Sequence, residues 1–134
     1  MPDWNQGVIE EFRANGGQVG GPFAGAPILL LHTIGAKSGS ERTNPMMYQA
    51  VGESFAVFAS RAGDDHNPDW YHNLLAHPDV TVEVGTETLE VTAHVLDPQE
   101  REPIWHKQKT RYPGFAKYEA KTTRVIPVVM LDRR

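Results

Sequence analysis

Short strand-like segments joined by hairpin-length links are the feature that most constrains the fold of this chain. Links as short as the one around Gly52-Glu53 and the one across Gly85 can join only antiparallel neighbours, because a parallel crossover needs a dozen or more residues. Six short antiparallel strands with the helices set aside favour a small closed or nearly closed barrel, an α+β fold that is mainly β. The six segments span residues 28–34, 43–51, 54–60, 80–84, 88–95 and 125–131.

Helix start and stop signals place the peripheral helices. Asn67 is expected to cap one helix with Pro68 at its first position, and Asp97 to cap another with Glu100 at the capping-box position. The Gly16-Gly17 pair is expected to end the first helix, since glycine accepts the left-handed conformation found there. The expected helices span residues 4–15, 68–76 and 98–111, and a short helix or turn follows Pro113.

Composition excludes several classes of function. The 134 residues fit one domain, 1–134, and the absence of cysteine excludes disulfides, thiolate catalysis and Cys-based metal sites. A net charge of -4 argues against nucleic acid as a partner. The six histidines contain no HExxH pair, so no metal is expected. No apolar run approaches a membrane span and the N-terminus lacks signal-peptide order, so a cytoplasmic location is expected.

The loop from Gly35 to Pro45 combines flexible backbone with positive charge. Its glycines let backbone N–H groups turn toward a common point, and Lys37, Ser38 and Arg42 add two cations and a hydroxyl donor. These features indicate an anion-binding loop. The alternative is a polar hairpin turn with solvated cations, and a Walker loop is excluded because the glycine spacing is wrong.

A second loop, residues 59–68, connects a strand end to a helix N-terminus. Free N–H groups there, together with Arg61, can hold an anion or the polar edge of a flat ring, although Asp64 and Asp65 oppose a phosphate lying directly on them. An ordinary connecting loop is the alternative.

Three aromatic residues recur at three-residue spacing near the C-terminus. On a helix, Tyr112, Phe115 and Tyr118 would lie on one side, where they could wall an apolar substrate cavity. Plain packing against the barrel is the alternative for these side chains.

Several segments, taken in order, form a specific combination over nearly the whole chain. They are VIEEFRANGG at 8–17, the loop 35–45, SRAG at 60–63, NPDWYHNL at 67–74, and YP at 112–113 with IPVV at 126–129. Together these segments resemble the deazaflavin-dependent nitroreductase family. The resemblance implies a split β-barrel of about six mostly antiparallel strands that binds coenzyme F420, a 5-deazaflavin with a phosphate and an oligoglutamate tail.

The resemblance also implies roles for individual residues. Lys37, Ser38 and Arg42 would hold the phosphate and part of the acidic tail, and the other cofactor-binding positions would border the ring or complete its pocket. The implied cofactor set is Ala36, Lys37, Ser38, Arg42, Thr43, Asn44, Pro45, Met46, Met47, Phe58, Ala59, Ser60, Arg61, Gly63, Asn67, Pro68, Trp70, Tyr71 and Asn73. The implied substrate-side set is Met47, Tyr112, Phe115 and Tyr118.

The implied reaction is hydride transfer from the reduced deazaflavin to an electron-poor acceptor such as a quinone, an enone or a nitroaromatic. Tyr118 or Tyr112 would donate a hydrogen bond to the developing oxyanion, as the catalytic residues. Three alternatives stay open: an FMN oxidoreductase on the same barrel, a non-catalytic F420 carrier, and an interaction module with solvated loops. The first helix is short and carries two glutamates, so at most weak peripheral membrane contact is expected. The sequence does not indicate the oligomeric state.

Overall fold

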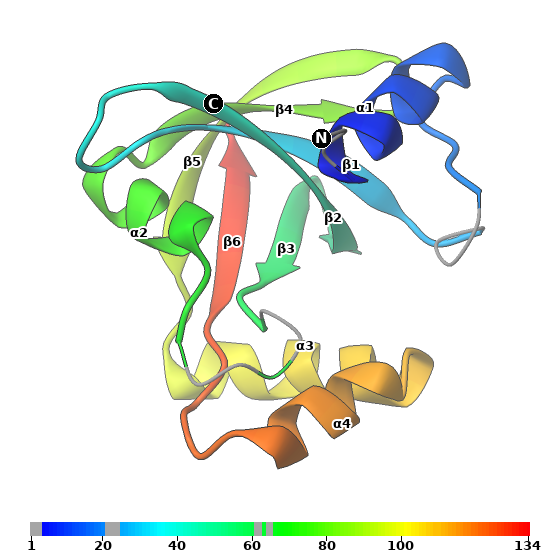
Figure 1. The fold of residues 1–134 in the computed structure, drawn as a ribbon. Coiled ribbons are helices and arrows are strands. Elements are labelled where there is room, and N and C mark those ends of the chain that lie inside the picture. Colours follow the sequence, from blue (N-terminus) through cyan, green and yellow to red (C-terminus); the bar gives the residue numbers. More distant parts are fainter. Residues whose placement is uncertain (1–3, 21–24, 61–62, 64–65) are drawn as a thin grey trace.

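The computed structural model describes residues 4–20, 25–60, 63 and 66–134, and this part of the chain forms a closed β-barrel with helices on its outside (Figure 1). The helices are α1 (Trp4–Ala14), α2 (Asp69–Ala76), α3 (Pro98–Arg111) and α4 (Gly114–Lys121). The strands are β1 (Ile28–Ile34), β2 (Glu41–Val51), β3 (Ser54–Phe58), β4 (Asp79–Val84), β5 (Glu87–Val95) and β6 (Val128–Arg133). The strands pair antiparallel throughout in the order β1-β2-β3-β6-β5-β4, which confirms the predicted barrel.

Alternation along the strands divides the apolar residues between the barrel interior and its outer face. On β1, Leu29 and Leu31 belong to the interior cluster, whereas Ile28 and Leu30 contact α1 on the outside. All four are buried, because β1 is covered on both faces, and its first half is therefore a continuous apolar run rather than an alternating one. The interior cluster also receives Leu74 from α2, which packs against the interior of the barrel.

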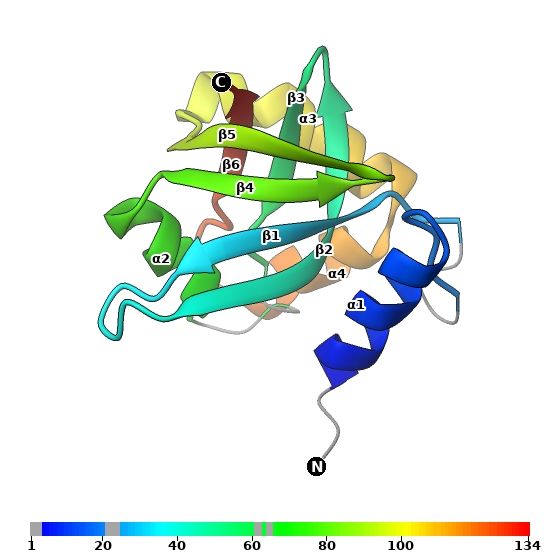
Figure 2. The ribbon, with the colours of Figure 1, turned by 90° about the horizontal axis from the view of Figure 1, so that it is seen from above.

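The remaining helices cover the outer face. Ile9 and Phe12 place α1 against β1 and β2, and Figure 2 shows this helix lying beside that hairpin. On another side, α3 and α4 bury Trp105 and Phe115 against the outer face of β3 and β6. Trp105 is 1% exposed, so it is a core residue.

Most local predictions are confirmed, with one wrong cap. The Asp97 side chain accepts a hydrogen bond from Glu100 N at 2.8 Å, as expected for an N-cap. At α2, however, Pro68 occupies the N-cap position and makes no side-chain bond there. The Asn67 carboxamide oxygen instead accepts a hydrogen bond from Arg124 at 2.8 Å. The side chain that was expected to cap the helix therefore binds a guanidinium that is distant in the sequence.

Strand ends differ slightly from the predicted ones. β2 begins at Glu41, two residues early, and β3 ends at Phe58, two residues early. β6 begins at Val128 rather than at residue 125, directly after Pro127. Proline has no N–H to offer a neighbouring strand, so the ladder starts at the next residue. The glycine pair that ends α1 is confirmed: Gly16 and Gly17 have φ of 62° and 97°.

The contact between α3 and α4 should depend on pH. Burial alone would raise the pKa of Glu119, but the hydrogen bond from Trp105 Nε1 and the ammonium of Lys109 hold it below its usual value. A lowered folded pKa means that this stabilisation is present above the unfolded pKa near 4.5 and is lost as pH falls through the folded value. Thermal melts between about pH 5 and about pH 3 should therefore fall less steeply for Glu119→Gln than for the parent.

A matched control for this prediction lies on α3. Glu102 has a side chain 70% exposed and approaches Arg101 only to 3.8 Å. Glu102→Gln removes the same charge, and we expect its melting temperature to follow the parent curve. Parallel curves for Glu119→Gln and the parent would contradict the prediction.

Candidate functional site

A cleft of about 840 Å³ lies at the end of the β1–β2 hairpin, between that hairpin, α1 and α2. Its volume is within the range of pockets that hold small molecules and cofactors. The lining is Gln6 and Ile9 from α1, Gly35 to Ser38 and Glu41 to Asn44 from the hairpin, and Pro68, Asp69, Trp70, His72 and Asn73 at α2.

The open edge of β2 explains why a cleft forms here. β1 pairs with Glu41 to Met47, whereas β3 pairs only with Tyr48 to Val51. Among the described residues, the start of β2 therefore has a strand neighbour on one side only. Alternation places Arg42 and Asn44 on the face that looks into the barrel, and Thr43 on the face toward α1.

Two cations of the cleft are available to a ligand. Lys37 and Arg42 are exposed, and within the described part of the chain no salt bridge or hydrogen bond involves either side chain. Glu41 and Asp69 line the same cleft and balance the two cations in formal charge. The side chains therefore suit an extended ligand whose negative charges sit at the hairpin end rather than one buried anion.

The hairpin loop is a tight, ordered turn. Gly35 N donates to Ser40 O at 2.7 Å, and Gly39 N donates to Gly35 O at 2.9 Å. A Cβ at Gly35 would lie 2.5 Å from Ser38 Oγ, so a larger residue there would force the Ser38 hydroxyl to move. The loop geometry thus fixes where Lys37 and Ser38 stand relative to the open edge of β2.

Asn73 joins this loop to α2. Its Oδ1 accepts from Ala36 N at 2.9 Å, and its Nδ2 donates to Thr33 Oγ1 at 3.2 Å. Asn73 is 8% exposed and Thr33 is 1% exposed. Because both ends of the amide are engaged by the protein, Asn73 holds the wall of the cleft in place.

Replacing Asn73 should loosen that wall. Asn73→Ala leaves the buried Thr33 hydroxyl and the Ala36 N–H without their partner, which is expected to cost about 1–3 kcal/mol in the free energy of unfolding. Denaturant unfolding measures the loss. His72→Ala, on the same helix but exposed, is the control and should change stability by less than about 0.5 kcal/mol. Equal effects of the two variants would contradict this role of Asn73.

The second predicted loop is anchored from the far end of the chain. Arg124 donates to the carbonyl oxygens of Ala59 and Ser60, at 3.1 and 2.9 Å, and to Asn67 Oδ1. A Cβ at Gly63, whose φ is 83°, would lie 2.8 Å from Tyr118 O. Gly63 therefore packs closely on α4. Arg61 lies outside the described residues.

The predicted substrate-side aromatics form a separate group. Phe115 is 9% exposed, and its ring lies 5.6 Å from Phe58 and 6.2 Å from Trp105. Tyr112 and Tyr118 are partly buried against the same cluster, and none of the three lines the cleft. The packing alternative therefore describes Phe115. Met47 contacts both this cluster and the one beneath α1.

The cleft brings together about half of the predicted cofactor residues. These are Ala36, Lys37, Ser38, Arg42, Thr43, Asn44, Pro68, Trp70 and Asn73. Pro45, Met46, Met47, Phe58, Ala59, Ser60, Gly63, Asn67 and Tyr71 are not part of its lining. No sequence pattern indicates the contribution of α1, which supplies Gln6 and Ile9, because the docking of that helix beside β2 is a tertiary contact.

Two further observations concern the described ranges only. No group of three or more His, Asp or Glu side chains lies close enough there to share a metal ion. No helix among these residues has both the length and the apolarity needed to cross a lipid bilayer.

Comparison with known proteins identifies the kind of molecule. The model of the F420H(2)-dependent quinone reductase family matches residues 4–133. The chain belongs to this family. An F420H(2)-dependent quinone reductase of Mycobacterium tuberculosis (strain H37Rv) is 39% identical over 127 residues, which are 92% of this chain and 85% of that protein.

Solved structures agree with this membership. An F420-H2-dependent reductase, FDR-A, is 41% identical and has a TM-score of 0.72, over 79% of this chain and 94% of that chain. The heme storage protein HutZ of Vibrio cholerae has a TM-score of 0.62 at 16% identity, over 97% of this chain and 90% of that chain, so it shares the fold alone.

Family membership confirms the central expectations. This member of the F420H(2)-dependent quinone reductase family is an F420-dependent reductase, and coenzyme F420 is its cofactor. That favours F420 over the FMN alternative, and an enzyme over a carrier protein. The resemblance to nitroreductases was imprecise: it holds for the deazaflavin cofactor, whereas the matching family is named for quinones.

Proposed function

We propose that this reductase binds coenzyme F420 in the cleft at the end of the β1–β2 hairpin and passes its hydride to a quinone. The observation that carries the proposal is the pair of exposed, unpaired cations of the described cleft, Lys37 and Arg42, beside the open edge of β2. An ammonium and a guanidinium at the mouth of a cleft suit a long polyanionic ligand. The family name supports the quinone as acceptor.

Lys37, Ser38 and Arg42 hold the phosphate and the start of the acidic tail in this proposal. The open edge of β2 then borders the ring, with Asn44 on the inner face and Thr43 on the outer face. Trp70, on α2, closes the opposite wall. When bound, reduced F420 supplies the hydride, so the protein has to orient the two reactants and exclude water.

The other predicted cofactor contacts continue from the same strand edge. Pro45, Met46 and Met47 follow Asn44 along β2, and Met47 reaches the cluster that contains Phe58. Ala59, Ser60, Arg61, Gly63 and Asn67 belong to the loop that Arg124 anchors, and Tyr71 follows Trp70 on α2. In the proposal they contact the ring edge and the linker, and Asn73 acts by positioning Ala36.

The binding position of the hydride acceptor is proposed to lie toward α4. Tyr112 and Tyr118 are partly buried at the surface of the aromatic cluster, and each keeps a phenol that can donate a hydrogen bond to a developing oxyanion. Phe115 supports them from beneath, with its ring 5.5 Å from that of Tyr118. Enones and nitroaromatics are proposed as further acceptors. Peripheral membrane contact through α1 would be weak, since Ile9 and Phe12 already pack on the barrel.

Spectral titration and turnover test the proposal together. We expect micromolar binding of F420, weaker binding of FMN, and oxidation of reduced F420 when a soluble quinone is added. An enone and a nitroaromatic tested in parallel rank the acceptors. Absence of micromolar F420 binding would refute the assignment of the cleft, and tight binding without oxidation by any acceptor would point to a carrier.

A further inference from the structure

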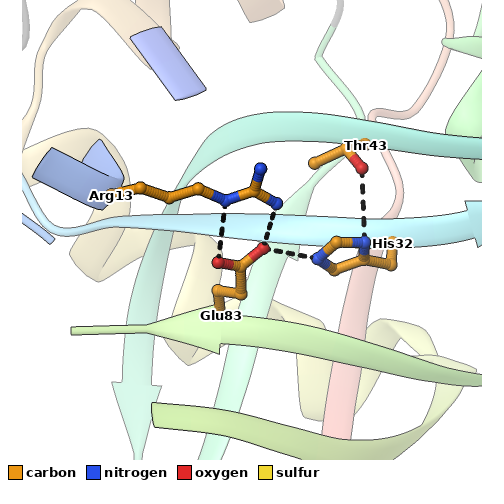
Figure 3. A network of polar contacts seen from close by, with 4 residues as sticks. All are labelled: Arg13, His32, Thr43 and Glu83. Atoms are coloured by element: carbon orange, nitrogen blue, oxygen red, sulfur yellow. Dashed lines mark hydrogen bonds and ion pairs between the residues drawn. The ribbon is translucent and has the colours of Figure 1, made fainter. Parts of the chain in front are cut away.

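A chain of polar contacts connects the outer wall of the cleft to α1 (Figure 3). Thr43 Oγ1 lies 3.2 Å from His32 Nδ1, and His32 Nε2 lies 2.6 Å from Glu83 Oε2. Arg13 grips the same carboxylate with two bonds, from Nε to Oε1 at 3.1 Å and from Nη2 to Oε2 at 2.7 Å. The four side chains come from β2, β1, β4 and α1, and Thr43 is the one that lines the cleft.

The carboxylate determines the direction of each hydrogen bond in this network. The hydrogen bonds from Arg13 lower the pKa of Glu83, burial opposes them, and the contact with His32 lowers it again. Glu83 is therefore ionised at neutral pH and can only accept, so His32 Nε2 must carry the proton that it donates. In the neutral ring Nδ1 is then an acceptor, and the Thr43 hydroxyl must donate to it.

We propose that His32 and Glu83 are positioning residues for cofactor binding: they hold the Thr43 hydroxyl as a hydrogen-bond acceptor toward a hydroxyl or amide N–H of the ligand in the cleft. This inference rests on the proposed function, because it takes F420 to occupy that cleft. A threonine hydroxyl in solution donates or accepts equally well. Here its proton is committed to His32, which selects ligands with a donor at this point.

The network is expected to contribute little to the stability of the fold. The Arg13 side chain is 51% exposed, and pairs of this kind contribute little to folding. The His32 and Glu83 side chains, however, are only 19% and 18% exposed. Burial beneath α1 therefore restricts the positions of their polar groups. A partly buried imidazole between a carboxylate and a hydroxyl orients that hydroxyl in the way that outer partners orient a metal ligand.

Binding measurements on matched variants at about pH 8, above the usual titration range of imidazole, test the proposal. Thr43→Val should weaken F420 binding by about fivefold to tenfold, whereas Thr43→Ser should stay within about twofold of the parent. His32→Asn, whose carbonyl oxygen stands in for Nδ1, should bind like the parent. His32→Gln, which reaches Glu83 and offers Thr43 no such acceptor, should bind as weakly as Thr43→Val.

The double variant separates positioning from simple loss of structure. Because His32 acts through Thr43, His32→Gln added to Thr43→Val should weaken binding no further. Effects on the dissociation constant that multiply, or Thr43→Val binding like the parent, would overturn the proposal.

Nitrogen NMR of the His32 ring in the ligand-free protein gives an independent reading. We expect the Nε2–H tautomer, and a shifted Nδ1 resonance in Thr43→Val. An Nδ1–H tautomer would overturn the inference whether or not F420 binds. Failure of the parent protein to bind F420, with the Nε2–H tautomer present and Nδ1 responding to Thr43→Val, would instead count against the proposed function while keeping the orientation of Thr43.

Discussion

Alanine at both Lys37 and Arg42 is expected to weaken F420 binding by about 100-fold. Each side chain is exposed at the cleft, and a charge-assisted hydrogen bond to phosphate or carboxylate contributes roughly tenfold in affinity at such a site. The loss should shrink as salt is added, because exposed charges are screened beyond about 8–10 Å at ordinary ionic strength. Spectral titration of the double variant at low and high salt measures both effects.

A control and a truncated ligand make this prediction specific. Lys107 and Lys117 are exposed cations on α3 and α4 that do not line the cleft, so Lys107→Ala with Lys117→Ala removes the same charge elsewhere. That control should bind F420 nearly as the parent does. An analogue without both the phosphate and the oligoglutamate tail should bind the parent and the cleft variant with nearly equal affinity. An equal loss in the control pair would show that only the overall charge matters.

The fold was predictable because its determinants are local. Short links permit only antiparallel neighbours, and the strand segments carry their own apolar runs. Closure of the barrel depends on the pairing of β1 with β4, from His32 opposite Thr81 to Leu29 opposite Val84. These partners are about fifty residues apart in the sequence, and no local sequence pattern predicts their pairing.

The site was predictable to the extent that its chemistry lies on one loop. Gly35, Lys37 and Arg42 are close in sequence, so their combination of tight turn and charge could be recognised directly. The contribution of α1 and the anchoring by Arg124 arise from long-range contacts. Tyr112, Phe115 and Tyr118 contact one cluster, but Tyr112 ends α3 and only the other two lie on α4. Their spacing also cannot tell whether a shared side faces a cavity or a core.

The junction between α1 and the barrel should be the most sensitive backbone position outside the core. Gly17 has φ of 97°, and a Cβ there would lie 2.6 Å from the Cα of Gly85 in the turn between β4 and β5. Gly17→Ala therefore combines a left-handed backbone with a clash against backbone that has no flexible end. We expect a loss of about 2–5 kcal/mol in the free energy of unfolding, from the backbone conformation and the overpacking together.

Denaturant unfolding of variants at two other glycines separates the effect of the backbone conformation from that of the clash. Gly16 has φ of 62° but a Cβ there would meet only Thr86 Cγ2 at 3.5 Å, so Gly16→Ala should lose about 1–2 kcal/mol from the backbone alone. Gly7 lies inside α1 with nothing within 4 Å, so Gly7→Ala should stabilise by about 0.5–1 kcal/mol. If Gly17→Ala proved no worse than Gly16→Ala, the close approach of the segment after α1 to the β4–β5 turn would be wrong, and with it the placement of α1 that brings Gln6 and Ile9 to the cleft.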